Sequence, residues 1–244
     1  MTETRNLYFD RIAKGYADKY EFEPQFAERR QVWNAVIAPY LEKLAPEQSC
    51  IFDVGCGNGN LSLPFAMSGY KVIGLDASEN MLHAAREIAE KANASSRTIY
   101  QCATLPLSRE ILNQFSCTAD MILCSSVLEY VSDIEGALAG LATLLRPGGV
   151  LLFSVPNRRS FFRFLERILK KTPIANNTYL AYQHHQLGRE QCKSLVKGSG
   201  LEWKASSLYA LPFHRWLSPM ARDFRPAILA TLLLVIAQKP LSHS

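Results

Sequence analysis

Short apolar runs rich in β-branched residues recur along the 244-residue chain, and segments of helical periodicity separate the first five of them. The runs span residues 50–54, 71–75, 98–102, 120–124, 150–155 and 229–237. Such alternation is typical of a parallel sheet with helices on both faces, and strands buried on both faces are expected to be nearly all apolar. We therefore predict an α/β fold with a doubly wound sheet.

The helix expected over residues 132–149 has clear end signals, because Ser132 or Asp133 caps its start and a Pro-Gly-Gly run stops it. After the fifth apolar run, residues 157–188 no longer follow the strand–helix pattern. We interpret this segment as an insertion over one end of the sheet. The composition, 48% hydrophobic and 20% charged, is that of an ordinary globular chain, and we expect residues 1–244 to form a single domain.

Three glycines at alternate positions, Gly55, Gly57 and Gly59, follow the first apolar run. In open α/β sheets, ligands bind beyond the carboxyl ends of the strands, and glycines there let the backbone approach a ligand closely. Asp76 follows the second run, about 20 residues after the first glycine, where an acid can accept hydrogen bonds from ribose hydroxyls. The pattern predicts a ligand that contains a ribose.

Two cofactors with a ribose fit this loop: a dinucleotide such as NAD, and S-adenosylmethionine. The dinucleotide fingerprint is GxGxxG, whereas this chain has GxGxG. Asp53 stands two positions before the first glycine, where its carboxylate would repel a pyrophosphate but attract the ammonium group of a methionine moiety. The loop therefore favours S-adenosylmethionine over NAD.

The stretches DVGCGNG (53–59) and GLDAS (74–78) resemble motif I and the following acid of the class I S-adenosylmethionine-dependent methyltransferases. FDRIAKGYADKY, CSSVLEYVSD and LLRPGGVLLFSVPN extend the similarity over residues 8–155. The later stretch 184–202 is similar to the type 11, ubiquinone-biosynthesis O-methyltransferase-like members. The resemblance implies a Rossmann-like, seven-stranded, mostly parallel sheet, with residues 157–188 as a helical cap over the acceptor site after strand five.

The resemblance also assigns cofactor contacts. Asp53 is expected to organise the glycine loop or to meet the amino group, and Asp76 to bind the ribose hydroxyls. Tyr16 either closes over the cofactor or only packs on the sheet. Many relatives carry an acid beside the adenine, but QCATLP has none, so backbone groups are left for that contact. The expected cofactor-binding residues are Tyr16, Asp53, Gly55, Cys56, Gly57, Gly59, Asp76, Ala77, Met81, Cys102, Ala103, Thr104 and Ser125.

A hydroxyl acceptor needs a base that titrates near neutrality, and histidine is the first candidate. His184 and His185 lie at the end of the insertion, where family members place substrate-facing residues, and His185 is the preferred base. Alternatively, either histidine only hydrogen-bonds the loop, and His214 is a further candidate. Glu129 stands where relatives carry the acid of a Leu-Glu-His run, and it either contacts the substrate or anchors a neighbouring helix.

The expected activity is methyl transfer from S-adenosylmethionine to a small apolar or aromatic molecule, with a hydroxyl oxygen as the preferred acceptor atom. Two alternatives stay open: a cofactor-binding regulatory or non-catalytic module, and an N- or C-methyltransferase of a small molecule. The chain lacks the motifs of the DNA amino and cytosine C5 methyltransferases, so we expect no nucleic-acid partner, and no metal site is predicted. The aromatic residues that either line an acceptor pocket or pack the cap are Phe161, Phe162, Tyr179, Tyr182, Tyr209, Phe213 and Trp216.

Residues 158–171 are a candidate amphipathic helix with basic residues on one side and apolar residues on the other. Either its apolar face packs on the sheet and its basic face is solvated, or its apolar face contacts an anionic membrane surface. The chain opens without an apolar leader and has no CxxC pair, so we expect a cytoplasmic protein, with peripheral membrane contact at most. The apolar residues of this helix are Phe161, Phe164, Leu165, Ile168 and Leu169, and the basic ones are Arg159, Arg163, Arg167, Lys170 and Lys171.

Overall fold

The computed structural model describes residues 24–171, 179–210 and 228–241. The predictions for Tyr16, Phe213, His214 and Trp216 lie outside these residues.

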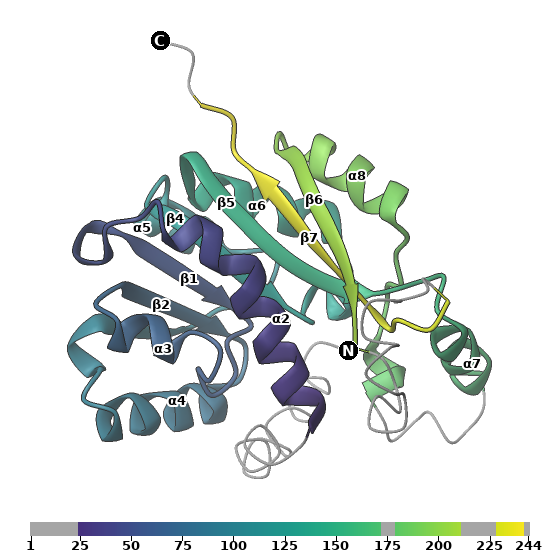
Figure 1. The fold of residues 1–244 in the computed structure, drawn as a ribbon, viewed down its shortest axis with the longest axis horizontal. Coiled ribbons are helices and arrows are strands. Elements are labelled where there is room, and N and C mark those ends of the chain that lie inside the picture. Colours follow the sequence, from purple (N-terminus) through teal and green to yellow (C-terminus); the bar gives the residue numbers. More distant parts are fainter. Residues whose placement is uncertain (1–23, 172–178, 211–227, 242–244) are drawn as a thin grey trace.

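A seven-stranded sheet in the order β3-β2-β1-β4-β5-β7-β6 forms the centre of the fold (Figure 1). The first five strands in that order pair in parallel, and β7 runs antiparallel to both β5 and β6. The predicted seven-stranded, mostly parallel sheet is therefore confirmed. The strands are β1 (Cys50–Val54), β2 (Lys71–Asp76), β3 (Thr98–Cys102), β4 (Ala119–Ser125), β5 (Leu145–Pro156), β6 (Glu202–Tyr209) and β7 (Leu232–Gln238).

Helices cover both faces of the sheet, and Figure 1 shows α2 lying across one of them. Neighbouring residues of one strand serve opposite faces, because side chains alternate along a strand. Ile51 packs with Trp33 of α2 on one face, whereas Phe52 packs edge-on against Phe115 of α5 on the other. The helices are α2 (Pro24–Leu41), α3 (Leu63–Met67), α4 (Glu79–Lys91), α5 (Arg109–Phe115), α6 (Ile134–Leu144), α7 (Phe161–Leu169) and α8 (Arg189–Gly198).

The start of α6 follows its predicted cap, and its end does not follow the predicted stop. The Asp133 carboxylate accepts a hydrogen bond from the Gly136 N–H at 2.8 Å, as an N-cap should. The helix ends at Leu144, before the Pro-Gly-Gly run, because β5 already begins at Leu145, which pairs with Ala119 of β4. Strand pairing thus ends the helix earlier than the local signal suggests.

The polar edge strand β6 has no counterpart among the apolar runs of the sequence. Of its eight residues, only Tyr209 is fully buried, since β6 lies at the edge of the sheet and pairs on one side with β7. An edge strand with a solvated face needs few apolar residues, so its sequence carries a weak strand signal.

The segment after β5 leaves the sheet and returns to the same place. Asn157 forms a bridge with Leu187, the Leu187 N–H donates to the Pro156 carbonyl at 2.9 Å, and the Arg158 N–H donates to the Leu187 carbonyl at 3.0 Å. Between these ends lie α7 and the 3-10 turn η5 (Tyr179–Tyr182). Within the described ranges, no helix is both long and apolar enough to cross a bilayer.

Candidate active site

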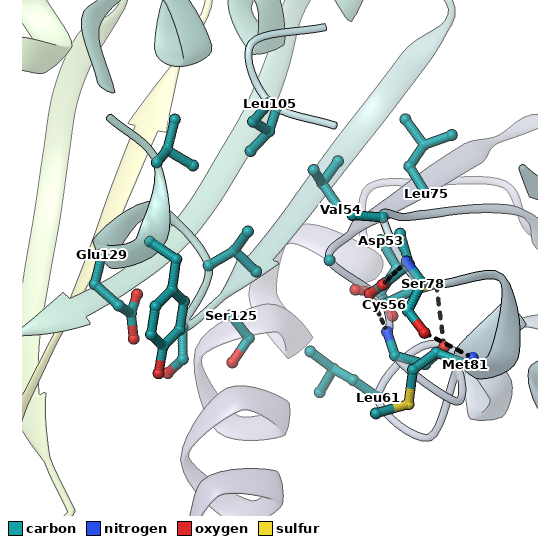
Figure 2. Close-up of a pocket in the computed structure, with 18 of the residues that line it drawn as sticks. Asp53, Val54, Cys56, Leu61, Leu75, Ser78, Met81, Leu105, Ser125 and Glu129 are labelled. Atoms are coloured by element: carbon teal, nitrogen blue, oxygen red, sulfur yellow. Dashed lines mark hydrogen bonds between the residues drawn. The ribbon is translucent and has the colours of Figure 1, made fainter. Parts of the chain in front are cut away.

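A cavity of about 480 Å³ lies beyond the carboxyl ends of β1, β2 and β4. Its size suits a small-molecule ligand, and its position is the usual ligand site of an open α/β sheet. Figure 2 shows Asp53, Ser78 and Met81 on one side of this cavity and Glu129 on the other. We call the first side the glycine-loop end and the second the Glu129 end.

The three glycines of the loop serve different purposes. All have positive φ, +71° at Gly55, +53° at Gly57 and +77° at Gly59, which side chains disfavour. A Cβ at Gly57 would meet only the Met81 sulfur, at 4.0 Å, so this backbone faces open cavity. A Cβ at Gly55 would lie 2.1 Å from Val127 Cγ2. Only Gly57 therefore lets the backbone approach a ligand in the expected way, whereas Gly55 makes room for the loop after β4.

Gly59 is the one loop glycine that does not line the cavity. A Cβ there would lie 2.8 Å from the Tyr100 hydroxyl, so the glycine makes room for a neighbouring core side chain. Gly59 therefore has a packing role instead of the expected contact with the cofactor.

The Asp76 carboxylate joins the end of β2 to the glycine loop. One of its oxygens accepts the Gly57 N–H at 2.8 Å, and the other accepts the Ser78 N–H at 2.9 Å. Carboxylate oxygens have further acceptor sites, and Asp76 lines the cavity. Asp76 can therefore hold the loop and still accept hydrogen bonds from ligand hydroxyls.

Asp53 is a buried carboxyl group at the bottom of the glycine-loop end. It is 2% exposed, and its Oδ2 has no hydrogen-bond partner among the described residues. Burial raises the pKa of Asp53 to about 7; the Ser62 hydroxyl lowers this pKa, and the Asp76 charge raises it. A buried carboxyl oxygen without a partner, facing a cavity, is suited to a cationic group.

These features fit S-adenosylmethionine. The open backbone at Gly57, the Asp76 carboxylate and the unpartnered oxygen of Asp53 match a ribose next to an ammonium-bearing methionine moiety. Ala77 and Met81 add apolar surface for an adenine. When bound, this cofactor would supply an activated methyl group, and the chain would supply orientation and a dry site.

The Glu129 end is assembled from segments far apart in the sequence. Glu129, in the 3-10 turn η3 (Leu128–Tyr130) after β4, is 3% exposed, and its Oε2 has no hydrogen-bond partner among the described residues. Burial raises the pKa of Glu129 to about 7, while a backbone hydrogen bond of Glu129 and the charges of Arg163 and Arg29 act to lower it. Both arginines line the same cavity.

Arg163 of α7 is held in a fixed position at this end. Its Nε donates to the Thr231 carbonyl at 3.0 Å, and its Nη1 donates to the two Glu166 oxygens at 2.9 and 2.7 Å. The Tyr179 hydroxyl donates to Glu166 at 2.9 Å from the other side of the insertion. The Arg163 and Glu166 side chains are only 12% and 20% exposed, so their ion pair is largely shielded from water, whereas Tyr179 is exposed.

The two histidines contact Glu129 through the backbone. The N–H groups of His184 and His185 donate to the Glu129 carbonyl at 2.6 and 3.2 Å. Nε2 of His185 lies 2.9 Å from the Val131 carbonyl, which requires that nitrogen to carry a proton. Neither histidine lines the cavity, whereas Glu129 does. Of the three predicted catalytic residues His184, His185 and Glu129, Glu129 is therefore the one that lines the cavity.

Most predicted cofactor residues line the cavity, and two described ones do not, Gly59 and Cys102. Cys102 is exposed at the end of β3. Of the aromatic residues, Tyr179 and Tyr209 line the cavity, whereas Phe161, Phe162 and Tyr182 do not. The predicted residues that do line it are Asp53, Gly55, Cys56, Gly57, Asp76, Ala77, Met81, Ala103, Thr104, Ser125 and Glu129.

The sequence does not predict Arg29, Gln183 and Thr231 as cavity residues, and neither interpretation of residues 158–171 places Arg163 in a cavity. No local motif marks these residues, because they meet only when α2, the insertion and the start of β7 come together. Ser126, which follows β4 beside Ser125, also lines the cavity, with a φ of +57° that is rare for a residue other than glycine.

The family model described as a methyltransferase domain matches residues 26–205, which is most of the chain. The chain belongs to this methyltransferase family. It is 32% identical to the ubiquinone biosynthesis O-methyltransferase of Coxiella burnetii (strain Dugway 5J108-111) over 158 residues, 62% of this chain and 64% of that protein. The enzyme of the same name from Acinetobacter baylyi is 28% identical over 222 residues, 86% of this chain and 88% of that protein.

The chain thus spans a little under two thirds of the length of the first of these relatives. Among solved structures, the magnesium protoporphyrin IX methyltransferase from Synechocystis PCC 6803 with bound SAH matches with a TM-score of 0.63 and 18% identity, over 88% of this chain and 84% of that one. This likeness shows the fold. The methyltransferase class and the fold predicted from the sequence are both confirmed, and S-adenosylmethionine is the cofactor that the class implies.

Proposed function

We propose that this chain transfers the methyl group of S-adenosylmethionine to a hydroxyl oxygen of a small apolar molecule, in particular an aromatic one. The observation that carries the proposal is a single cavity with two different ends. The glycine-loop end has the unpartnered Asp53 oxygen and the Asp76 carboxylate, and the Glu129 end has a second buried carboxyl group. The similarity to enzymes named ubiquinone biosynthesis O-methyltransferase supports a hydroxyl acceptor.

Radiolabelled methyl transfer tests this proposal. The purified chain is incubated with S-adenosylmethionine and a set of catechols that carry alkyl chains of increasing length. We expect O-methylated product, with KM falling as the chain lengthens, because the cavity is lined by apolar and aromatic groups. Product from amines or activated carbon acids but not from hydroxyls would favour an N- or C-methyltransferase. Tight cofactor binding without any product would favour a regulatory module.

Residues 157–188 act, in this proposal, as the cap of the acceptor site within a single domain, 1–244. Arg163, Tyr179 and Gln183 come from this segment and line the cavity, while its two ends meet at the Asn157–Leu187 bridge. A segment with adjoining ends can be shortened without displacing the sheet. Replacing residues 161–183 by a short Gly/Ser linker should therefore keep cofactor binding and abolish methyl transfer.

Helix α7 has the opposite orientation to that of an ordinary cap helix. Its basic residues Arg163 and Arg167 hydrogen-bond inward, to Glu166 and Gln186. Its five apolar residues, from Phe161 to Leu169, are between 39% and 49% exposed. This contradicts the interpretation in which the apolar face packs on the sheet and the basic face is solvated.

The exposed apolar face of α7 is proposed as a contact for an anionic membrane surface. Arg158 and Arg159 before the helix and Lys171 after it are exposed, whereas the Lys170 ammonium donates to the Gln183 carbonyl. Each basic residue near an anionic surface adds about 1 kcal/mol of attraction. The acceptor end of the cavity lies on the inner side of the same helix, so a lipid-soluble acceptor would have a short path to it.

Vesicle flotation separates this contact from ordinary surface exposure. We expect binding to vesicles that contain phosphatidylglycerol, no binding to pure phosphatidylcholine, and release by salt. The double variant Phe164→Ser/Ile168→Ser should lose the binding. Met67→Ser is the matched control, since Met67 is an exposed apolar residue on α3. Concentration-dependent dimers that the double variant abolishes, without vesicle binding, would instead assign the face to a second copy of the chain.

A further inference from the structure

Glu129 and Arg163 line the same end of the cavity, and each has hydrogen-bonding atoms that its bonds to the chain do not use. Oε2 of Glu129 has no partner among the described residues. The Arg163 guanidinium uses Nε and Nη1 in its bonds to Thr231 and Glu166, and none of these bonds involves Nη2. Arg163 forms its ion pair with Glu166 rather than Glu129, and Glu129 and Arg163 both line the cavity.

We infer that Glu129 removes the proton of the acceptor hydroxyl and that Nη2 of Arg163 holds the resulting oxyanion. The inference rests on the proposed function. As the acceptor oxygen forms a bond to the transferred methyl carbon, it displaces the neutral thioether sulfur of the donor, which keeps the electron pair of the broken carbon–sulfur bond. The proton of the hydroxyl ends on Glu129, and water later carries it away. A buried carboxylate that accepts a proton near neutral pH suits this step.

The two groups have different supports. The His184 and His185 N–H groups fix the Glu129 backbone, so they position the base without touching the acceptor. The Glu166 carboxylate accepts from the Arg163 guanidinium and is itself held by the Tyr179 hydroxyl, so side chains fix the position of Arg163. A donor held in place before the reaction stabilises developing negative charge without reorganising, which is commonly the largest contribution of a site to catalysis.

The surroundings of Glu129 favour a proton affinity matched to this role. Burial raises its pKa, whereas a hydrogen bond from its own backbone and the charges of Arg163 and Arg29 lower it, and the balance is a pKa of about 7. The charged and titratable groups around it are Arg29 of α2, Cys124 of β4, Tyr130 of η3, Arg163 of α7 with Glu166 and Tyr179 behind it, and the adjoining His184 and His185. Removal of Arg163 should therefore raise the pKa of Glu129.

Carbon-13 NMR of the full chain with labelled glutamate side chains tests the pair without any acceptor. We expect one carboxyl resonance with a midpoint near pH 7, lost in Glu129→Gln, retained in Glu135→Gln and shifted to higher pH in Arg163→Met. Glu135 is the matched control because it is exposed on α6. If Arg163→Met does not fold, Arg163→Lys serves, since it keeps the charge and should leave the midpoint nearly unchanged. A wild-type chain in which every glutamate titrates below pH 6 would overturn the inference.

Methyl transfer to an alkyl catechol supplies the second readout. Glu129→Gln should lower kcat by about 10²–10⁴ and Arg163→Lys by about 10–10³, with the affinity for S-adenosylhomocysteine unchanged. In the wild type, kcat should rise with pH to a plateau above about pH 7, because the base acts in its ionised form. Full activity in Glu129→Gln would refute the inference and leave the proposed function intact. Absence of product from the wild type would refute the proposed function, while the NMR titration still decides the Glu129–Arg163 coupling.

Discussion

The two ends of the cavity each contain a buried carboxyl group, and they differ in what surrounds it. Asp53 lies at the end of β1 beside a second acid, Asp76, so a cationic ligand would offset the repulsion between the two carboxylates. Glu129 lies beside Arg29 and Arg163, so its ionised form is supported by the chain itself. In our proposal, this difference places the cationic cofactor at the first end and proton removal from a neutral acceptor at the second.

The largest effect is expected in the pH dependence of stability. The folded-state pKa of each carboxyl group is raised to about 7, so each stabilises the fold fully below its unfolded pKa, near 4, and this contribution is lost as the pH rises through 7. At 1.36 kcal/mol per pKa unit, each loss is about 3–4 kcal/mol.

Urea unfolding at pH 5 and pH 9 measures this loss. Asp53→Asn and Glu129→Gln should each unfold at higher urea than the wild type at pH 9, and their advantage should shrink at pH 5. Saturating S-adenosylmethionine should remove the advantage of Asp53→Asn alone, because the cation then compensates the Asp53 charge. Equal responses of both variants to the cofactor would break the distinction between the two ends.

A substitution at Gly55 tests how the two ends are joined. Gly55→Ala places a Cβ 2.1 Å from Val127 and keeps a φ of +71°, so we expect a loss of about 2–5 kcal/mol in the free energy of unfolding. Adding Val127→Ala should restore the stability that is lost to overpacking and leave the loss of about 1–2 kcal/mol that is due to backbone strain. Denaturant unfolding of the single and double variants measures both, and a double variant no more stable than Gly55→Ala would show that Val127 is not the obstacle.

Much of the glycine-loop end can be predicted from sequence, because its residues follow from two strand ends and one turn. Asp53, Gly57 and Asp76 lie within 24 consecutive residues, and sheet topology brings β1 beside β2. The roles of Gly55 and Gly59 could not be foreseen, since Val127 and Tyr100 reach them through tertiary packing.

The Glu129 end could be predicted only in part. The place of Glu129 after β4 makes it a candidate, but neither interpretation of residues 158–171 turns Arg163 toward a cavity, because helical periodicity separates two faces without saying which one is buried. Contacts from Thr231, Glu166 and Tyr179 decide that orientation. Strand β6 could not be predicted for a similar reason: its polar residues suit the edge of a sheet, and no local pattern in the sequence shows that it lies at an edge.

The smallest expected effect is that of His185. His185→Ala removes one hydrogen bond to the Val131 carbonyl, so we expect a loss of about 1 kcal/mol in stability and less than about a tenfold loss in kcat. His83→Ala is the control, because His83 is an exposed histidine on α4. A fall of 10² or more in kcat for His185→Ala, with a normal kcat for Glu129→Gln, would transfer the role of base to the histidine.

Calorimetric titration of S-adenosylhomocysteine into the wild type, Asp76→Ala and Glu129→Gln tests most directly whether the two ends of the cavity have separate roles. Asp76→Ala removes a charged acceptor for two hydroxyl groups and should lose roughly 2–4 kcal/mol of binding free energy, whereas Glu129→Gln should bind like the wild type. NAD should give no heat of binding in any of the three. Equal losses in Asp76→Ala and Glu129→Gln, or binding of NAD in place of S-adenosylhomocysteine, would contradict the assignment of the glycine-loop end to this cofactor.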